Sequence, residues 1–240
     1  MRVLLVGGSG YVGSMVTPYL KAEHQLRVLD PAPPKDPSVE YLGGSAADMA
    51  VVRQAVQGME GVVYMAMPRT AEGRYDCWDI DANYDLHVKH LHRVLLAAVE
   101  AKIARAVYTS SMSVYAYRPG GFTQGDDTPP DAPDLYGFTK RLGELVCDFF
   151  ARVHGVAAVS LRLNGPMPLE DWHRAAAAGR ISTQTAAPDV ASAIALALTA
   201  PITGHHAVNI AGDWAGKVVR CTRAKELLGW EPRERPRATG

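Results

Sequence analysis

The sequence has little that would direct it to nucleic acid or to a membrane. Its 25 basic and 25 acidic side chains balance, so no net charge attracts it to nucleic acid or to an anionic lipid surface. The longest apolar runs, such as residues 3–6 and 191–198, are far too short to cross a bilayer. Residues 1–10 lack the pattern of a signal peptide. We therefore expect no nucleic-acid partner and no membrane partner.

Cysteine is also scarce. Cys77, Cys147 and Cys221 are the three cysteines of the chain, and they lie far apart without the spacing of metal ligands. Isolated cysteines of this kind are typically buried free thiols in a reducing compartment. We therefore expect a cytoplasmic protein that binds no metal through these residues.

What the sequence does contain is a regular alternation of short apolar runs and longer helical patterns. The patterns predict strands at 2–6, 26–30, 38–42, 61–67, 104–110 and 157–163, and helices at 11–22, 49–57, 76–101, 135–154, 189–199 and 223–228. Strands that are apolar almost throughout and alternate with helices predict an α/β fold, a doubly wound parallel sheet of the Rossmann type. Residues 117–133, rich in glycine and proline, are predicted to form a long loop.

Three glycines follow the first predicted strand at intervals of three. Gly7, Gly10 and Gly13 lie in the stretch GGSGYVG, where the backbone can turn tightly and approach a pyrophosphate at the N-terminus of the next helix. Asp30 ends the second strand, where a carboxylate accepts hydrogen bonds from both ribose hydroxyls and repels a 2′-phosphate. The sequence therefore favours NAD, while Lys35 keeps NADP open as the alternative.

Tyr136 and Lys140 lie four residues apart, so they share a face of the helix predicted at 135–154. A free phenol has a pKa near 10 and is a poor base at neutral pH. An ammonium about 5 Å away, at an effective dielectric constant of about 20, attracts a phenolate by roughly 3 kcal/mol, which would lower the tyrosine pKa by about two units. Tyr136 would then remove a hydroxyl proton while hydride leaves the same carbon. The alternative is a surface pair that falls at helical spacing by chance.

Together, these motifs resemble those of the extended short-chain dehydrogenase/reductases, the NAD-dependent epimerase/dehydratase group. The resemblance covers nearly the whole chain and includes TSSMSVY at 109–115, YGFTK at 136–140, RLNGP at 162–166, APDVASAIALAL at 187–198 and AKELLGWEP at 224–232. It implies a core at 1–165 that binds NAD. It also implies a short substrate-binding segment with a returning helix and strand at 166–240, effectively within one structural domain.

The resemblance also implies roles for individual residues. Ser111 would be the catalytic serine that hydrogen-bonds the reacting oxygen, with Ser110 and Ser113 as rivals, beside Tyr136 and Lys140. Asp48 would lie against the adenine, and residues 164–166 near the nicotinamide. The full set of implied cofactor contacts is Gly7, Gly10, Tyr11, Val12, Gly13, Asp30, Asp48, Met65, Ala66, Asn83, Tyr136, Lys140 and Asn164.

One departure from the family pattern lies in the helix predicted at 76–101. His87 and His90 stand where relatives have an Asn-x-x-Gly signature, and Asn83 lies one turn earlier. Either Asn83 orders the active-site backbone in place of the usual asparagine, or that role is lost. No acidic or cysteine cluster accompanies the two histidines, so we expect them to be exposed or at an interface and expect no metal.

A second departure is the short connection at 167–188, where relatives that act on nucleotide-activated sugars carry a long insertion. It has room for one short helix and a turn, which indicates a compact substrate without a nucleotide. The layout is similar to that of the uronate dehydrogenases. By this resemblance Met112 and Ser113 replace an Asn-His pair that grips the sugar. Arg180, with Arg174 as its rival, would bind a substrate carboxylate.

We therefore expect an NAD-dependent oxidoreductase that acts on a hydroxyl or carbonyl carbon of a small sugar or sugar-acid-like substrate. The alternatives are an epimerase or dehydratase that recycles tightly bound NAD, and a non-catalytic NAD-binding regulator. The resemblance also implies a homodimer that pairs the helices at 76–101 and 135–154. Either the partner or the sheet would cover their apolar residues, which are Leu86, Leu91, Val94, Leu95, Leu142, Leu145 and Val146.

Overall fold

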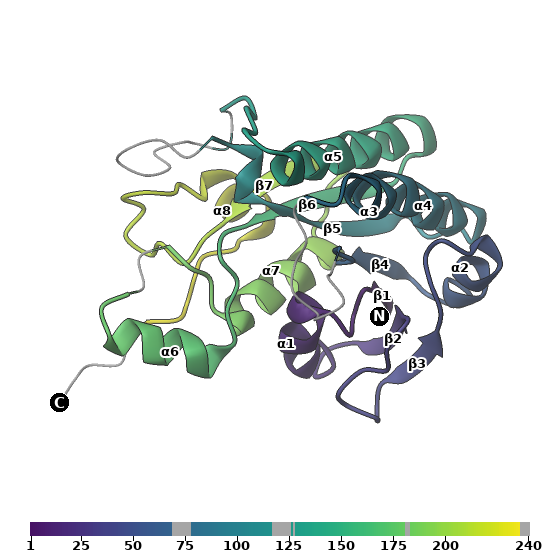
Figure 1. Cartoon of the computed structure of the whole chain (residues 1–240), viewed down its shortest axis with the longest axis horizontal. Helices are drawn as coiled ribbons and strands as arrows, with labels where there is room; N and C mark the ends of the chain where they lie inside the picture. The colour runs from purple at the N-terminus through teal and green to yellow at the C-terminus, as the bar shows by residue number, and fades with distance from the viewer. Residues whose placement is uncertain (69–77, 117–125, 127, 181–182, 236–240) are drawn as a thin grey trace.

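Seven parallel strands form one sheet in the order β3-β2-β1-β4-β5-β6-β7 (Figure 1). The computed structural model describes residues 1–68, 78–116, 126, 128–180 and 183–235. The strands are β1 (Arg2–Val6), β2 (Gln25–Asp30), β3 (Glu40–Gly43), β4 (Gly61–Tyr64), β5 (Arg105–Ser111), β6 (Ala157–Leu163) and β7 (His205–Ile210). The helices are α1 (Tyr11–Leu20), α2 (Met49–Ala55), α3 (Ile80–Tyr84), α4 (Leu91–Glu100), α5 (Leu135–His154), α6 (Leu169–Ala177), α7 (Ala187–Thr199) and α8 (Thr222–Leu228).

Helices cover both faces of the sheet (Figure 1). α1 and α7 pack on one face over a core that includes Leu5, and α2, α4 and α5 pack on the other over a core that includes Leu4. Successive residues of a strand point to opposite faces, which is why these neighbours of β1 belong to different cores. None of the helices within the described ranges is both long and apolar enough to cross a membrane.

The predicted doubly wound parallel sheet is confirmed, and each of the six predicted strands is present. The fourth strand ends at Tyr64 rather than at residue 67. β7 adds a seventh strand next to β6, and α6 is the short helix expected within 167–188. Most of the loop predicted at 117–133 lies outside the described residues, and the division of the chain at residue 165 stays a prediction.

The helix predicted at 76–101 is interrupted by a π-helical turn, Asp85–His90, between α3 and α4. Residues 76 and 77 lie outside the described residues. Leu91, Val94 and Leu95 of α4 are buried against the sheet, whereas Leu145 of α5 is exposed. The sheet therefore covers these apolar residues of α4, whereas Leu145 of α5 faces outward. The homodimer stays a prediction.

A buried ion pair joins α5 to β6. Glu144 accepts hydrogen bonds from Arg162 Nε and Nη2, both at 2.8 Å, and from Ser110 Oγ at 2.8 Å. Arg162 also donates to the Tyr115 hydroxyl. Glu144 and Arg162 are both buried. A bidentate pair of this kind compensates the burial of the two charges, and removing one partner leaves the other uncompensated.

We predict that Glu144→Ala lowers the free energy of unfolding by about 3–5 kcal/mol, because the Arg162 guanidinium would remain buried without its counter-charge. Urea unfolding followed by circular dichroism measures the change. Asp148→Ala is the control, since it breaks the exposed Arg152–Asp148 pair of the same helix and should cost less than about 1 kcal/mol. Equal losses in the two variants would contradict the prediction.

Candidate active site

The predicted glycine loop connects β1 to α1 at the carboxyl edge of the sheet. Gly7 has a φ of +80°, and a Cβ there would lie 2.6 Å from the backbone of Ala66, which follows β4. A Cβ at Gly13, in the first turn of α1, would lie 2.4 Å from the Gly8 carbonyl oxygen. Gly10 is the N-cap of α1. The loop therefore excludes side chains at two positions, and the first amide groups of α1 remain available to an anion.

A cleft of about 540 Å³ lies beside this loop. Its lining includes Asp30 at the end of β2, Ser45 after β3 and Ala66 after β4. The Asp30 carboxylate accepts hydrogen bonds from the backbone N–H groups of Ser9 at 3.1 Å and Ala32 at 3.0 Å, which ties the glycine loop to the end of β2. The strand order reverses between β1 and β4, and open parallel sheets bind nucleotides in the crevice at such a reversal.

The cleft fits a dinucleotide. It is lined by the glycine loop, whose backbone a pyrophosphate can approach, and by the acidic side chain of Asp30 at the end of β2, which can accept from ribose hydroxyls. The predicted cofactor residues that line it are Gly7, Gly10, Tyr11, Val12, Asp30, Met65 and Ala66.

Asp48 does not line this cleft. It is the N-cap of α2, and its Oδ1 accepts a hydrogen bond from Ala50 N at 2.9 Å. Ser45 and Ala46 line the cleft after β3 instead. An Asp placed directly before a helical pattern is a common capping signal, so the sequence did contain a reason to place Asp48 at the helix end.

Asn164 likewise lies outside the cleft lining. Its Nδ2 donates to the Thr183 carbonyl oxygen at 2.9 Å and to Thr183 Oγ1 at 2.7 Å. Its backbone N–H donates to Ile210 O of β7 at 3.0 Å. In the structure Asn164 therefore connects the end of β6 to the segment before α7.

Ser111, Tyr136 and Lys140 come together at the carboxyl end of β5. Ser111 is the last residue of β5, and its hydroxyl lies close enough to the Tyr136 phenol to influence the pKa of that phenol. Lys140 is 1% exposed. Its Nζ donates to the Thr109 carbonyl oxygen at 2.9 Å and lies 5.8 Å from the centre of the Tyr136 ring. The spacing of Tyr136 and Lys140 in the sequence thus corresponds to a contact in the structure.

Gly137 allows α5 to begin this close to β5. A Cβ at Gly137 would lie 1.9 Å from the Ser113 carbonyl oxygen, which no larger residue can accommodate. The Ser113 hydroxyl accepts a hydrogen bond from Ser111 Oγ at 3.1 Å, while the buried Ser110 hydroxyl donates to Glu144. Of the three candidate serines, the structure connects Ser111 to Tyr136. The role of Gly137 was not recognised in the sequence, although it lies between Tyr136 and Lys140.

Burial dominates the electrostatics of Tyr136 and Lys140. It raises the pKa of Tyr136 to about 12, and the neighbouring Ser111 hydroxyl acts in the opposite direction. It lowers the pKa of Lys140 to about 7. The lowered tyrosine pKa expected from the spacing is therefore wrong for the protein alone. Loss of water around the phenolate outweighs the attraction of a lysine that is itself only partly charged at neutral pH.

His87, rather than Asn83, lies against Tyr136. The two ring centres are 5.7 Å apart, and His87 Nδ1 is 2.9 Å from Thr139 Oγ1. Asn83 is buried one turn earlier, where its Nδ2 donates to a backbone carbonyl four residues before it at 2.8 Å.

His87 and His90, which we expected to be exposed or at an interface, are both buried. In the described part of the chain, no three His, Cys, Asp or Glu side chains form a cluster that could hold a metal ion.

The residues predicted to bind substrate lie in different surroundings. Met112 is 2% exposed and packs with Ala211 and Val219 in a small core cluster, so its side chain is not available to a substrate. Ser113 is half-buried beside Ser111. Arg180 is exposed and lines a hollow of about 320 Å³ together with Arg174 of α6.

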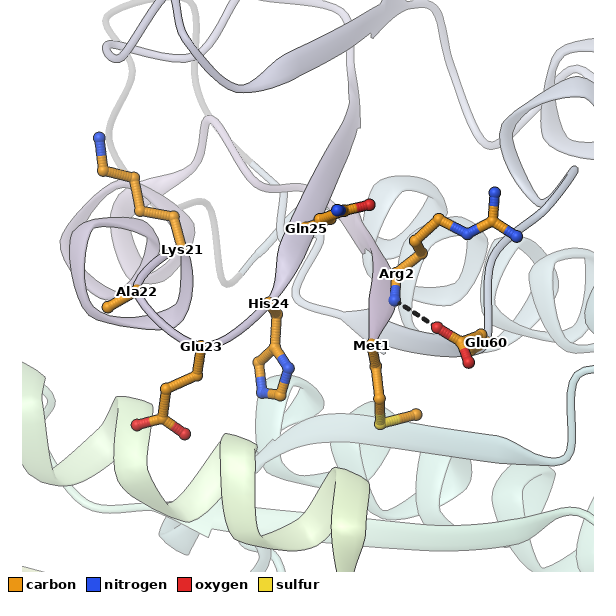
Figure 2. Close-up of a pocket in the computed structure, with 8 residues that line it drawn as sticks. All are labelled: Met1, Arg2, Lys21, Ala22, Glu23, His24, Gln25 and Glu60. Carbon is orange, nitrogen blue, oxygen red and sulfur yellow. Dashed lines mark hydrogen bonds between the residues drawn. The ribbon is translucent and has the colours of Figure 1, made fainter.

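A second large hollow lies at the opposite, amino-terminal edge of the sheet (Figure 2). Its volume is also about 540 Å³, and its lining includes Lys21, Gln25 and Glu60. Figure 2 shows the backbone N–H of Arg2 donating to the Glu60 carboxylate, at 2.7 Å. The lining mixes charges of both signs and contains none of the predicted site residues. The cleft at the carboxyl edge is therefore the candidate site.

A dinucleotide cleft at the strand reversal of a parallel sheet, with a serine at the end of the next strand and a tyrosine and a lysine on the helix that packs against it, is the arrangement of a short-chain dehydrogenase/reductase. Residues 3–167 match the NAD dependent epimerase/dehydratase family. The chain belongs to this family of enzymes, and NAD is the family's cofactor.

Two curated relatives are dehydrogenases by name. A "3 beta-hydroxysteroid dehydrogenase/Delta 5-->4-isomerase" of Mycobacterium tuberculosis is 33% identical over an alignment of 175 residues that covers 68% of this chain and 46% of that protein. The uronate dehydrogenase of Pseudomonas putida is 26% identical over an alignment of 221 residues that covers 88% of this chain and 76% of that protein. The chain thus spans less than half the length of the steroid dehydrogenase that it matches.

Among solved structures, the UDP-glucose 4-epimerase of Thermotoga maritima superimposes with a TM-score of 0.80. The match covers 98% of this chain and 94% of that one, at 17% sequence identity. At that identity, the likeness supports the fold alone.

We predict that Lys140 makes the free energy of unfolding depend on pH. Because the pKa of Lys140 falls from 10.5 to about 7 on folding, the unfolded chain binds more protons between these values, and stability rises with pH across that range. Lys140→Met removes this dependence. The difference in the free energy of unfolding, Lys140→Met minus wild type, should therefore be highest near pH 6. It should fall by more than about 1 kcal/mol between pH 6 and pH 10.

Urea unfolding at several pH values between about 6 and 10 measures this difference. Lys217→Met replaces an exposed lysine and is the matched control, with a small and constant difference from the wild type. A difference for Lys140→Met that does not change with pH would contradict the prediction.

We predict that Asp30→Ala weakens NAD binding about tenfold or more and NADP binding much less. The variant loses an acceptor for the ribose hydroxyls, but it also loses the charge that repels a 2′-phosphate. Calorimetric titration with each dinucleotide measures the two affinities. Glu23→Ala, at the opposite edge of the sheet, should change neither. An equal loss for both dinucleotides would show that Asp30 acts only by holding the backbone of Ser9 and Ala32.

Proposed function

We propose that this chain is an NAD-dependent oxidoreductase acting on a small, non-nucleotide, polyhydroxylated substrate. It would transfer hydride between a hydroxyl or carbonyl carbon of that substrate and the nicotinamide. The observation that carries the proposal is the contact of Ser111, Tyr136 and Lys140 at the end of β5, the strand next to β4 and its cleft.

In this proposal, Ser111 orients the reacting oxygen and Tyr136 exchanges a proton with it. The pKa of Tyr136, about 12, keeps the phenol protonated at neutral pH, so it is ready to donate to a carbonyl oxygen. In the oxidative direction, Tyr136 has to lose its proton first, and positive charge close to the ring favours that loss. Lys140 can supply this charge, and bound oxidised NAD supplies the hydride acceptor and a further positive charge.

We infer that the glycine loop and the end of β2 hold the cofactor. Gly7 and Gly13 keep the backbone clear of side chains, and the first amide groups of α1 would face the pyrophosphate. Asp30 would accept from the ribose hydroxyls. Ser45 and Ala46 would take the position beside the adenine that the sequence assigned to Asp48.

A small substrate is favoured by the short connection between β6 and α7, in whose described residues α6 is the one helix. Enclosing a nucleotide as well as a sugar would require more chain than this. Arg174 and Arg180 line one hollow, and guanidinium groups bind carboxylates well. The relative named for uronate supports a sugar acid, and both curated relatives support dehydrogenase chemistry.

The family match also supports a second function, an epimerase or dehydratase that keeps its NAD bound. The two functions differ in the fate of the cofactor, which a dehydrogenase releases in reduced form after each turnover. A non-catalytic regulator is the third reading, and the contact among the three catalytic candidates argues against it.

The first experiment is to follow the absorbance of reduced nicotinamide after mixing the protein with NAD or NADP and free sugars, uronates or small hydroxy acids. Reduction of NAD by one substrate group is the expected result. No reduction across the panel, with NAD binding shown separately, would contradict the dehydrogenase. NAD that stays bound through purification would then indicate the epimerase or dehydratase.

We predict that Tyr136→Phe reduces turnover by at least about 100-fold, because the proton-transferring hydroxyl is lost. NAD affinity should stay within about twofold of the wild type, since phenylalanine keeps the ring and the proposal assigns the dinucleotide mainly to the glycine loop and Asp30. Steady-state kinetics and calorimetric titration measure the two effects. Tyr84→Phe, at an exposed tyrosine of α3, is the control. Turnover close to that of the wild type in Tyr136→Phe would rule out the assignment.

A further inference from the structure

His87 occupies an unusual position next to the catalytic candidates. It lies in the π-helical turn Asp85–His90 and has no solvent exposure. Its ring is close to Tyr136, and its Nδ1 contacts Thr139 Oγ1. Its other ring nitrogen, Nε2, is buried without a hydrogen-bond partner in the described structure. Buried polar atoms normally find a partner, and π-helical turns are frequent at functional sites, so this atom calls for a physical explanation.

The hydrogen bonds of Thr139 define the tautomer of His87. The Thr139 hydroxyl has one proton, and it is directed to the carbonyl oxygens of Leu135 at 3.0 Å and Tyr136 at 3.1 Å. Thr139 Oγ1 is then an acceptor toward His87, so Nδ1 carries the imidazole proton. Nε2 is left with a free lone pair. Burial and the nearby Lys140 hold the pKa of His87 far below its usual value, so the ring stays neutral.

Lys140 has more hydrogen-bond donors than the described residues have acceptors for them. An ammonium group has three N–H donors, and the described residues provide Lys140 with one acceptor, the Thr109 carbonyl oxygen. Its other neighbours are the rings of Tyr108 and Tyr136, whose centres lie 5.0 Å and 5.8 Å from Nζ. Glu144, one turn further along α5, already accepts from Ser110, Arg141 and Arg162.

We propose that His87 is a positioning residue for the Tyr136–Lys140 pair, in which the Nε2 lone pair accepts a hydrogen bond from the Lys140 ammonium through a bridging water. The inference rests on the proposed function for the importance of that pair. A buried water needs two to four polar partners. In this proposal they are His87 Nε2, Lys140 Nζ and the Tyr108 hydroxyl, which is also buried without a partner. The His87 ring and Lys140 Nζ both lie beside the Tyr136 ring, and Lys140 Nζ is 5.0 Å from the centre of the Tyr108 ring. The bridge stabilises the charged form of Lys140 beside the Tyr136 ring.

The first test is the tautomer of His87 in the unmodified protein. The ¹⁵N chemical shifts of imidazole nitrogens distinguish a protonated from an unprotonated atom, and comparison with His87→Gln assigns the signals. We expect a protonated Nδ1 and an unprotonated Nε2 for His87 across the neutral pH range. A protonated Nε2 would overturn the proposal, because that atom could then not accept from Lys140.

The second test is the pKa of Lys140, measured by NMR of ¹³C-labelled lysine, with Lys140→Met to assign the signal. His87→Phe keeps a ring but removes the acceptor, so the pKa of Lys140 should fall by roughly one unit. His87→Gln provides an acceptor oxygen and should restore most of the wild-type value. His90→Phe is the matched control, because His90 is buried in the same turn but lies near Asp85 and Arg93 rather than Lys140.

An unchanged Lys140 pKa in His87→Phe would overturn the proposal. So would an equal shift in all three variants, since that would mean only a general disturbance of the turn. If His87→Phe does not fold, Thr139→Val removes the hydroxyl that selects the tautomer and should bring the protonated Nε2 form into the ¹⁵N spectrum. Both measurements are independent of turnover. A shifted Lys140 pKa without hydride transfer would therefore refute the proposed function alone, and hydride transfer with an unshifted pKa would refute the role of His87 alone.

Discussion

The burial of the Lys140 ammonium group is the interaction on which the rest of the site depends. A cation loses its water shell when it is buried, and here it gains a backbone carbonyl of β5 and the faces of two tyrosine rings. Its charge is therefore set by how closely α5 lies on β5. Two glycines of α5 determine this distance: a Cβ at Gly137 would meet the Ser113 carbonyl, and one at Gly143 would lie 2.5 Å from the Tyr108 hydroxyl. The packing of α5 on β5 thus also determines the protonation of Lys140.

The features that could be predicted from the sequence are those encoded over a few neighbouring residues. Strands buried on both faces are apolar almost throughout, so the order of strands and helices and the parallel sheet followed from periodicity. The spacing of Gly7, Gly10 and Gly13 before a helix, and the position of Asp30 at a strand end, located the cleft. The four-residue spacing of Tyr136 and Lys140 placed both side chains on one helix face.

The features that could not be predicted depend on segments that meet only in the folded chain. Whether Asp48 reaches the cleft or caps α2 depends on where β3 ends, within a few residues. Met112 is covered by Ala211 and Val219, about a hundred residues further along the chain. The sign of the Tyr136 pKa shift depends on how completely the site excludes water, which spacing along a helix cannot show. The burial of His87 depends on the π-helical turn at Asp85–His90, for which the sequence contains no recognisable signal.

That change of helix type has a consequence for how the site can vary among related proteins. A π-helical turn holds one residue more than the α-helical turn that it replaces, and each residue of an α-helix advances the chain by about 100° around the axis. Deleting one residue of this turn would restore a regular helix without rotating α3 relative to α4, because the turn itself absorbs the extra residue, and only residues of the turn would move around the axis. A different side chain would then face Tyr136. The identity of the residue behind the catalytic pair can therefore change through a single insertion or deletion, without any substitution at the position itself.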